Sequence, residues 1–86
     1  MERLNTTATS DESAAWQPAG DAILQIEQGD NSVVEIQCRA DASAPWVVAK
    51  TVGANDDRIV KLSYVPWLKV AARNPNGTQV NVWDNE

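Results

Sequence analysis

The side chains with the greatest potential for chemistry are the carboxylates and amides of two polar segments, residues 29–32 (Gly-Asp-Asn-Ser) and 55–57 (Asn-Asp-Asp). Their oxygens are the hard ligands that calcium prefers. Neither segment has the spacing of a calcium-binding loop, and neither has enough carboxylates to surround an ion. Because Asp and Asn are also favoured in turns, we interpret both segments as solvated turns and predict no metal site.

Few residues of this chain are of the types that usually catalyse reactions, because it contains no histidine and a single cysteine, Cys38. A nucleophile and its base would have to come from hydroxyls, lysines or carboxylates, and no pair of these stands in a recognised catalytic pattern. Cys38 continues an alternating apolar pattern and is expected to be a small buried residue. We therefore predict that the protein is not an enzyme and that it binds no cofactor.

Four tryptophans in a chain without phenylalanine require an explanation. Trp46 and Trp67 each follow a proline at the start of an apolar run, and we expect them to anchor these runs to the core or its rim. Trp83 is out of phase with its apolar neighbours and should point away from the interior, whereas Trp16 lies beside a polar N-terminal segment. For Trp16 and Trp83 we favour a partner interface, because tryptophan is enriched among the residues that dominate binding.

The elements that must position these residues are short runs rich in β-branched side chains, separated by turn residues such as those at 29–32 and 74–77. Apolar and polar residues alternate in most runs, which is typical of an antiparallel sheet buried on one face. The sequence therefore predicts an all-β fold, a small antiparallel β-sandwich or barrel of about six strands. The residues predicted to form the core are Leu24, Ile26, Val34, Ile36, Cys38, Leu68, Val70, Val80 and Val82.

Residues 1–16 are polar, and Leu4 is the only large aliphatic side chain after Met1. Such a segment buries too little apolar surface to offset the entropy of ordering it. We therefore divide the chain into an extended N-terminal arm, residues 1–16, which contact with a partner would order, and a β-sandwich domain, residues 17–86. Deleting the first fifteen residues should leave the sandwich folded but abolish binding to the partner. A domain of this size buries only about 60% of its unfolded surface, so docking on a larger partner would stabilise it.

Twelve acidic and seven basic residues give a formal net charge of −5. The basic residues are scattered, so the sequence does not predict the positive surface that tracks nucleic-acid phosphates. No apolar run approaches the length that crosses a bilayer, and residues 1–7 lack the apolar region of a secretory signal. We expect a protein made in a cytoplasm that binds neither nucleic acid nor membranes.

Two motif pairs carry a resemblance to a known group of proteins. The first is Val33–Gln37 followed by Pro45–Val48, and the second is Tyr64–Val70 followed by Asn76–Val82. With these motifs the chain, from about residue 20 to residue 84, resembles the small β-sandwich proteins of tailed-bacteriophage virions, the cement or decoration proteins of the head and related tail and neck parts. The Asp-Gly pair usual in the first loop is replaced here by residues 41–44.

The resemblance implies a structural virion protein that binds the outer surface of the head, often as a trimer, and stabilises contacts between subunits of the major capsid protein. It would be made in the cytoplasm of the bacterial host. We expect the arm and four side chains, Leu4, Trp16, Trp83 and Arg73, to contact the partner. Two alternatives remain open: a tail or neck connector or fibre-associated protein of the same fold, and a carbohydrate-binding module whose indoles stack on sugar rings.

Overall fold

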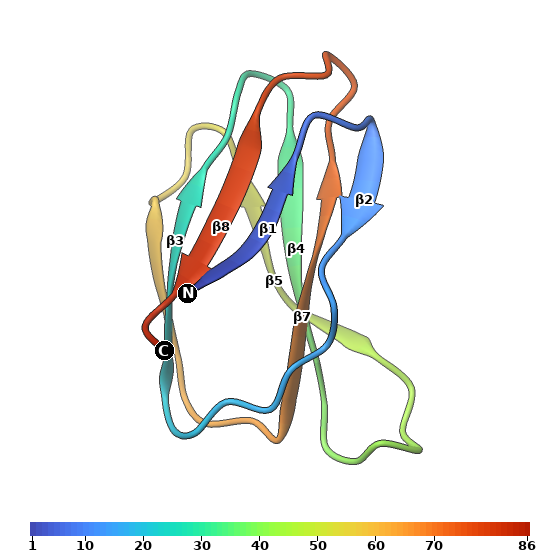
Figure 1. Cartoon of the computed structure of the whole chain (residues 1–86), viewed down its shortest axis with the longest axis vertical. Coiled ribbons are helices and arrows are strands. Elements are labelled where there is room, and N and C mark those ends of the chain that lie inside the picture. Colours follow the sequence, from blue (N-terminus) through green and yellow to red (C-terminus); the bar gives the residue numbers. More distant parts are fainter.

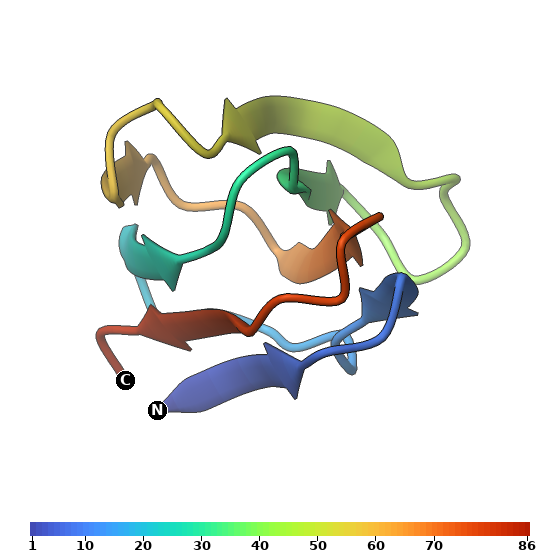
Figure 2. The same cartoon turned by 90° about the horizontal axis from the view of Figure 1, so that it is seen from above.

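Eight strands form two stacked four-stranded antiparallel sheets in the computed structural model, which describes all 86 residues (Figures 1 and 2). One sheet, called the β8 sheet below, has the order β1-β8-β3-β6, and the other, called the β7 sheet, has the order β2-β7-β4-β5. The strands are β1 (Glu2–Thr6), β2 (Ser10–Glu12), β3 (Ala22–Glu27), β4 (Val33–Arg39), β5 (Val47–Gly53), β6 (Ile59–Leu62), β7 (Trp67–Arg73) and β8 (Val80–Asp84). No helix in the structure could cross a lipid bilayer.

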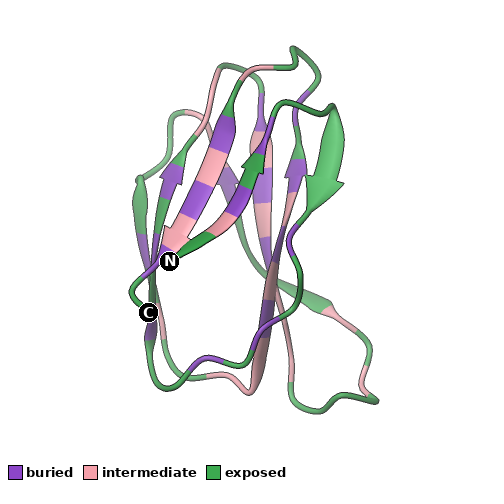
Figure 3. Ribbon diagram, viewed as in Figure 1, coloured by how far each residue is buried: buried purple, intermediate pink, exposed green.

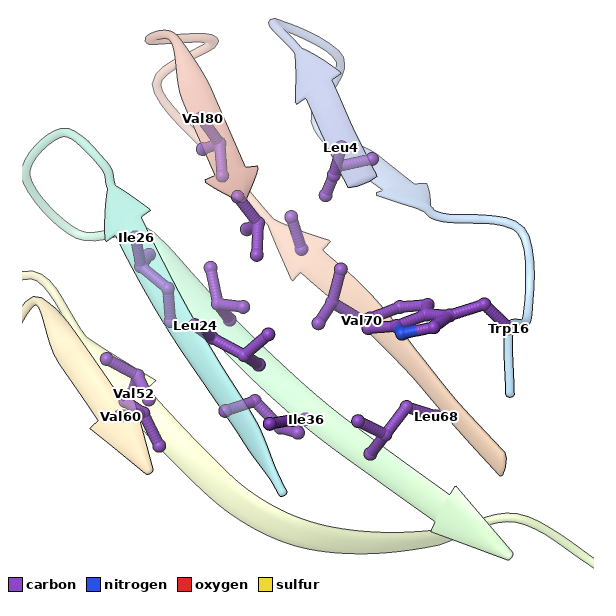
Figure 4. Close-up of a cluster of buried hydrophobic side chains, with 14 residues drawn as sticks. Leu4, Trp16, Leu24, Ile26, Ile36, Val52, Val60, Leu68, Val70 and Val80 are labelled. Atoms are coloured by element: carbon purple, nitrogen blue, oxygen red, sulfur yellow. The ribbon is translucent and has the colours of Figure 1, made fainter. Parts of the chain in front are cut away.

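The predicted β-sandwich is confirmed, and the six predicted runs correspond to β3 through β8. Side chains alternate between the two faces of each strand, so the apolar positions of the sequence pattern meet between the sheets (Figures 3 and 4). Every predicted core residue is buried except Cys38, which is half-buried and packs against the edge of the core. Burying these side chains between two sheets is the main force that holds the sandwich together.

The N-terminal segment, residues 1–16, is not an extended arm: it adds one strand to an edge of each sheet. β1 pairs with β8 in a register that places Leu4 opposite Val82, and β2 pairs with β7. Leu4 is only 6% exposed and belongs to the core. Backbone hydrogen bonds to β8 and β7 order this segment, which is why its low apolar content did not reveal it.

The expectation that Trp16 contacts a partner is also wrong, because Trp16 is only 8% exposed. Its backbone N–H donates to the carbonyl of Leu68, and the N–H of Leu68 donates back, both at 2.9 Å. The Arg3 guanidinium lies 4.5 Å from the centre of the Trp16 ring. Trp16 therefore closes one end of the core, where the chain leaves the β7 sheet for β3.

The turns contain the residue types that the sequence predicts for them. Asn31 and Gly77 have positive φ angles, 61° and 64°, in the two predicted turns. Asn74, which is fully buried, organises the second turn: its amide donates to the carbonyl of Thr78, and its Oδ1 accepts from the Thr78 hydroxyl at 3.0 Å. These turns fix the lengths and the register of the strands that carry the surface residues described next.

Candidate functional site

The outer face of the β8 sheet carries a cluster of apolar side chains, Ile23, Ile59 and Trp83, which we call the Trp83 patch. Ile59 and Trp83 both lie opposite Gln25, so the row across β6, β3 and β8 consists of Ile59, Gln25 and Trp83. Ile23 and Ile59 are 40% and 50% exposed, and Trp83 is half-buried. A shallow depression of about 170 Å³ lies among them. The prediction that Trp83 points away from the interior is confirmed.

The rest of this face is polar and consists largely of amides. Asn81 donates from Nδ2 to Oε2 of Glu2 at 3.0 Å, and Gln79 donates to Oδ1 of Asn5. Because Gln79 directly precedes β8 and Asn81 and Trp83 occupy outward positions of the strand, the face changes from polar to apolar along β8. The Trp83 patch therefore has a polar border, which is the usual arrangement at a protein interface.

The outer face of the β7 sheet carries a different cluster, which we call the arginine–tryptophan stack: Arg39, Trp46 and Trp67. Arg39 lies directly opposite Trp67 in the pairing of β4 with β7, and Trp46 immediately precedes β5. The Arg39 guanidinium carbon lies 4.3 Å from the centre of the Trp46 ring and 4.9 Å from that of Trp67. These distances are short enough for cation–π attraction to both indoles.

Lys69 completes this surface, because its Nζ lies 4.9 Å from the centre of the Trp46 ring and forms an ion pair with Glu12 at 3.3 Å. Trp46 and Trp67 are half-buried and lie outside the core cluster. Of the two places expected for them, the core or its rim, the core is therefore wrong. They pack on the outer side of the sheet, because Arg39 and Lys69 occupy the outward positions beside them.

The four residues expected to contact a partner are not brought together. Leu4 and Trp16 lie in the core, so neither side chain is on the surface of the folded chain. Trp83 lies on the outer face of the β8 sheet, whereas Arg73 is exposed on the outer face of the β7 sheet and pairs with Glu35 at 3.3 Å. The structure thus offers two separate surfaces, on opposite sides of the sandwich, in place of one.

Sequence reasoning missed three of the residues that form these surfaces: Ile23, Ile59 and Arg39. Ile23 and Ile59 are apolar at positions where alternation calls for a polar side chain, and this departure was the signal available for them. Arg39 gave no such signal. Its contact with the two indoles depends on the pairing of β4 with β7, strands that are separated by β5 and β6 in the chain.

Two loop carboxylates, of Asp56 in the predicted polar segment 55–57 and of Asp41 in the loop before β5, act as hydrogen-bond acceptors within their own turns. Oδ2 of Asp56 accepts the Gly53 N–H at 2.7 Å, and Oδ1 of Asp41 accepts the Ser43 hydroxyl at 2.7 Å. The hydrogen bonds from the hydroxyl and the backbone of Ser43 lower the pKa of Asp41. No group of three or more acidic, cysteine or histidine side chains is placed to hold a metal ion.

The candidate functional surfaces are therefore the Trp83 patch and the arginine–tryptophan stack, one on the outer face of each sheet. Each combines indole surface with neighbouring polar or charged groups, which is the composition of residues that dominate protein binding. Comparisons of the chain with models of known protein families, with curated proteins and with solved structures find no match.

Proposed function

We propose that this chain is a structural protein of a bacteriophage virion, a cement or decoration protein that binds the major capsid protein on the outer surface of the head. The resemblance of the sequence motifs at residues 33–37, 45–48, 64–70 and 76–82 to such proteins suggests the setting. The observation that carries the docking role is the Trp83 patch, where Ile23 and Ile59 are 40% and 50% exposed beside a half-buried indole. Exposed apolar side chains that gather around one depression and have polar neighbours are typical of protein-binding surfaces.

The size of the molecule fits docking through one broad face. Its two longest dimensions are 34 and 23 Å. A side of the molecule with these dimensions is close to the ~800 Å² that each partner contributes to a standard protein interface. The broad side to which the outer face of the β8 sheet belongs is therefore of the size that docking needs.

Docking through a sheet face replaces the hypothesis of an arm that folds on its partner. Because residues 1–16 are already paired with β8 and β7, they gain no further order when the protein binds. A preformed surface also avoids the entropic cost of ordering a segment during association. On this account the N-terminal strands support the docking face, since β1 lies beside β8.

A tail or neck connector of the same fold would use the same surface, and the location of the chain on the particle separates it from a head protein. Glycan binding is favoured by one observation, the position of Trp83 beside the amides of Gln25 and Asn81 on one face. An indole next to amide hydrogen-bonding groups can hold a sugar ring. A glycan array with the intact chain tests that alternative.

Co-sedimentation with purified heads that lack the chain tests the proposed function. We expect Ile59→Glu to weaken binding about 30-fold, because a charge placed in the apolar patch removes the ~2 kcal/mol of a dominant contact. The matched control, Thr51→Glu, places the same charge on an exposed position of the β7 sheet and should bind like the wild type. Full occupancy by the Ile59→Glu variant, or no binding by the wild-type chain, would contradict the proposal.

A further inference from the structure

Arg39 differs from every other arginine of the chain in its hydrogen bonds. Arg3, Arg58 and Arg73 each donate to a carboxylate, of Asp84, Glu27 and Glu35 respectively. Arg39 donates to none, and its Nε is buried without any acceptor. Its two terminal nitrogens, Nη1 and Nη2, also have no hydrogen-bond partner in the chain, but unlike Nε they are not buried. A guanidinium with free donors is held in a fixed position on the outer face of the β7 sheet.

The two indoles explain why this guanidinium is fixed. Trp46 and Trp67 lie within 5 Å of its carbon, at 4.3 and 4.9 Å, so cation–π attraction restrains a side chain that is otherwise flexible. Asp41, two residues further along the chain, interacts with Arg39 through charge alone and uses its Oδ1 to accept both bonds from Ser43. The planar donor fork of Arg39 thus remains available for a carboxylate from another molecule.

The surroundings of the stack favour a carboxylate on a protein over an acidic sugar. The Arg39 guanidinium covers ring surface of both indoles, and Lys69 also lies over Trp46, so this ring surface is not free to stack on a sugar. Val48, which lies opposite Gln37 on the same face of the sheet, is 50% exposed and adds apolar surface beside the stack. A cation next to aliphatic and indole surface matches an acidic side chain with apolar neighbours.

We propose that the arginine–tryptophan stack is a second docking site, which binds a carboxylate within an apolar segment of a partner protein through the terminal nitrogens of Arg39. This inference rests on the proposed docking function and extends it to the opposite face of the sandwich. With the Trp83 patch on one side and the stack on the other, the chain holds two protein surfaces together. Arginine and tryptophan are the residue types most enriched among dominant contacts.

Titration of the full chain with two short synthetic peptides tests this site, followed through the indole N–H signals in NMR spectra. One peptide alternates glutamate with leucine, and the other has glutamine in place of glutamate. We expect the glutamate peptide to shift the Trp46 and Trp67 signals and to bind about tenfold more tightly, because charge-assisted hydrogen bonds to arginine are roughly twice as strong as their neutral counterparts. The Trp16 signal, from a buried indole, should not move.

Two variants show which group is responsible. Arg39→Gln should abolish the preference for glutamate over glutamine, whereas Arg73→Gln, on the same face but already paired with Glu35, should retain it. Sialyllactose serves as an acidic glycan in a parallel titration. Equal binding of the two peptides, binding of neither peptide, or a preference for sialyllactose at Trp46 and Trp67 would overturn the inference. None of these outcomes bears on the proposed role of the Trp83 patch, which the head-binding test of Ile59→Glu decides separately.

Discussion

Asp84 is the residue that joins the N-terminal strand to the rest of the sandwich. Its side chain is 1% exposed, and its Oδ2 accepts from Arg3 Nη2 at 2.9 Å and from Arg3 Nε at 3.0 Å. Burial raises the pKa of Asp84, but the hydrogen bond and the positive charge of Arg3, with the Glu86 backbone and the amino terminus, outweigh it, so the net pKa is lowered. The carboxylate is thus ionised and paired in the folded chain.

Asp84→Asn should lower the free energy of unfolding at neutral pH by about 3 kcal/mol, because it leaves the Arg3 guanidinium without its buried partner. Since the pKa of Asp84 is lower in the folded chain than in the unfolded one, its contribution to stability is complete above about pH 5 and is lost as the pH falls through the folded value. Urea unfolding from neutral to acid pH measures this difference between wild type and variant.

The control is Glu27→Gln, which breaks the exposed ion pair with Arg58 and should cost less than about 1 kcal/mol at any pH. If Asp84→Asn is as stable as Glu27→Gln at neutral pH, or if the deficit of Asp84→Asn does not narrow in acid, then Asp84 does not anchor β1 in the way described.

At the scale of elements, β1 and β2 belong to the fold, so deleting residues 1–16 should unfold the chain. The deletion removes an edge strand from each sheet and takes Leu4 and Trp16 out of the core. Loss of a buried leucine or tryptophan side chain costs about 2–5 kcal/mol each, which together approaches the whole stability of a domain of this size. We expect the truncated chain to lose its cooperative thermal transition in circular dichroism. A sharp transition near the wild-type temperature would restore the view of these residues as an independent arm.

Strand β5 is an edge strand whose structure opposes pairing with another copy. Lys50 lies opposite Ile36, on the side of the sheet that faces the core, and a register shift interrupts the pairing with β4 between Ile36 and Gln37. An inward charge and a bulge are two devices that keep edge strands from pairing. The exposed Val47 and Val48 would otherwise make this strand prone to association.

Lys50→Val should therefore promote self-association while leaving the thermal stability within about 1 kcal/mol of the wild type. Sedimentation velocity over a range of concentrations measures the effect. Thr51→Val is the matched control, since it adds the same side chain to the neighbouring position of β5 without removing the charge, and it should behave like the wild type. The role assigned to Lys50 fails if both variants associate to the same extent, or if neither does.

At the scale of the whole molecule, the features that the sequence predicts correctly are those that depend on the local alternation of apolar and polar residues. The runs that became β3 through β8 and their buried faces follow from residues such as Leu24, Ile36 and Val80. The features that escaped depend on contacts between distant parts of the chain. β1 and β2 are held by pairing with β8 and β7, and Arg39 meets Trp67 through the register of β4 with β7.

The same difference between local pattern and distant contact applies to the tryptophans. Trp83 could be placed on an outer face from its phase alone, whereas Trp16 could not be placed in the core, because its burial depends on the bridge to Leu68. The proposed function depends on the two outer faces, since a docking protein uses the surfaces that the fold leaves exposed.

The most direct test of the central claim is an electron cryo-microscopy reconstruction of heads that carry the wild-type chain. We expect density for the sandwich on the outer surface of the head, with the outer face of the β8 sheet, and Trp83 within it, against the major capsid protein. Density on the tail or neck alone, or a sandwich on the head whose β8 sheet faces solvent, would contradict it.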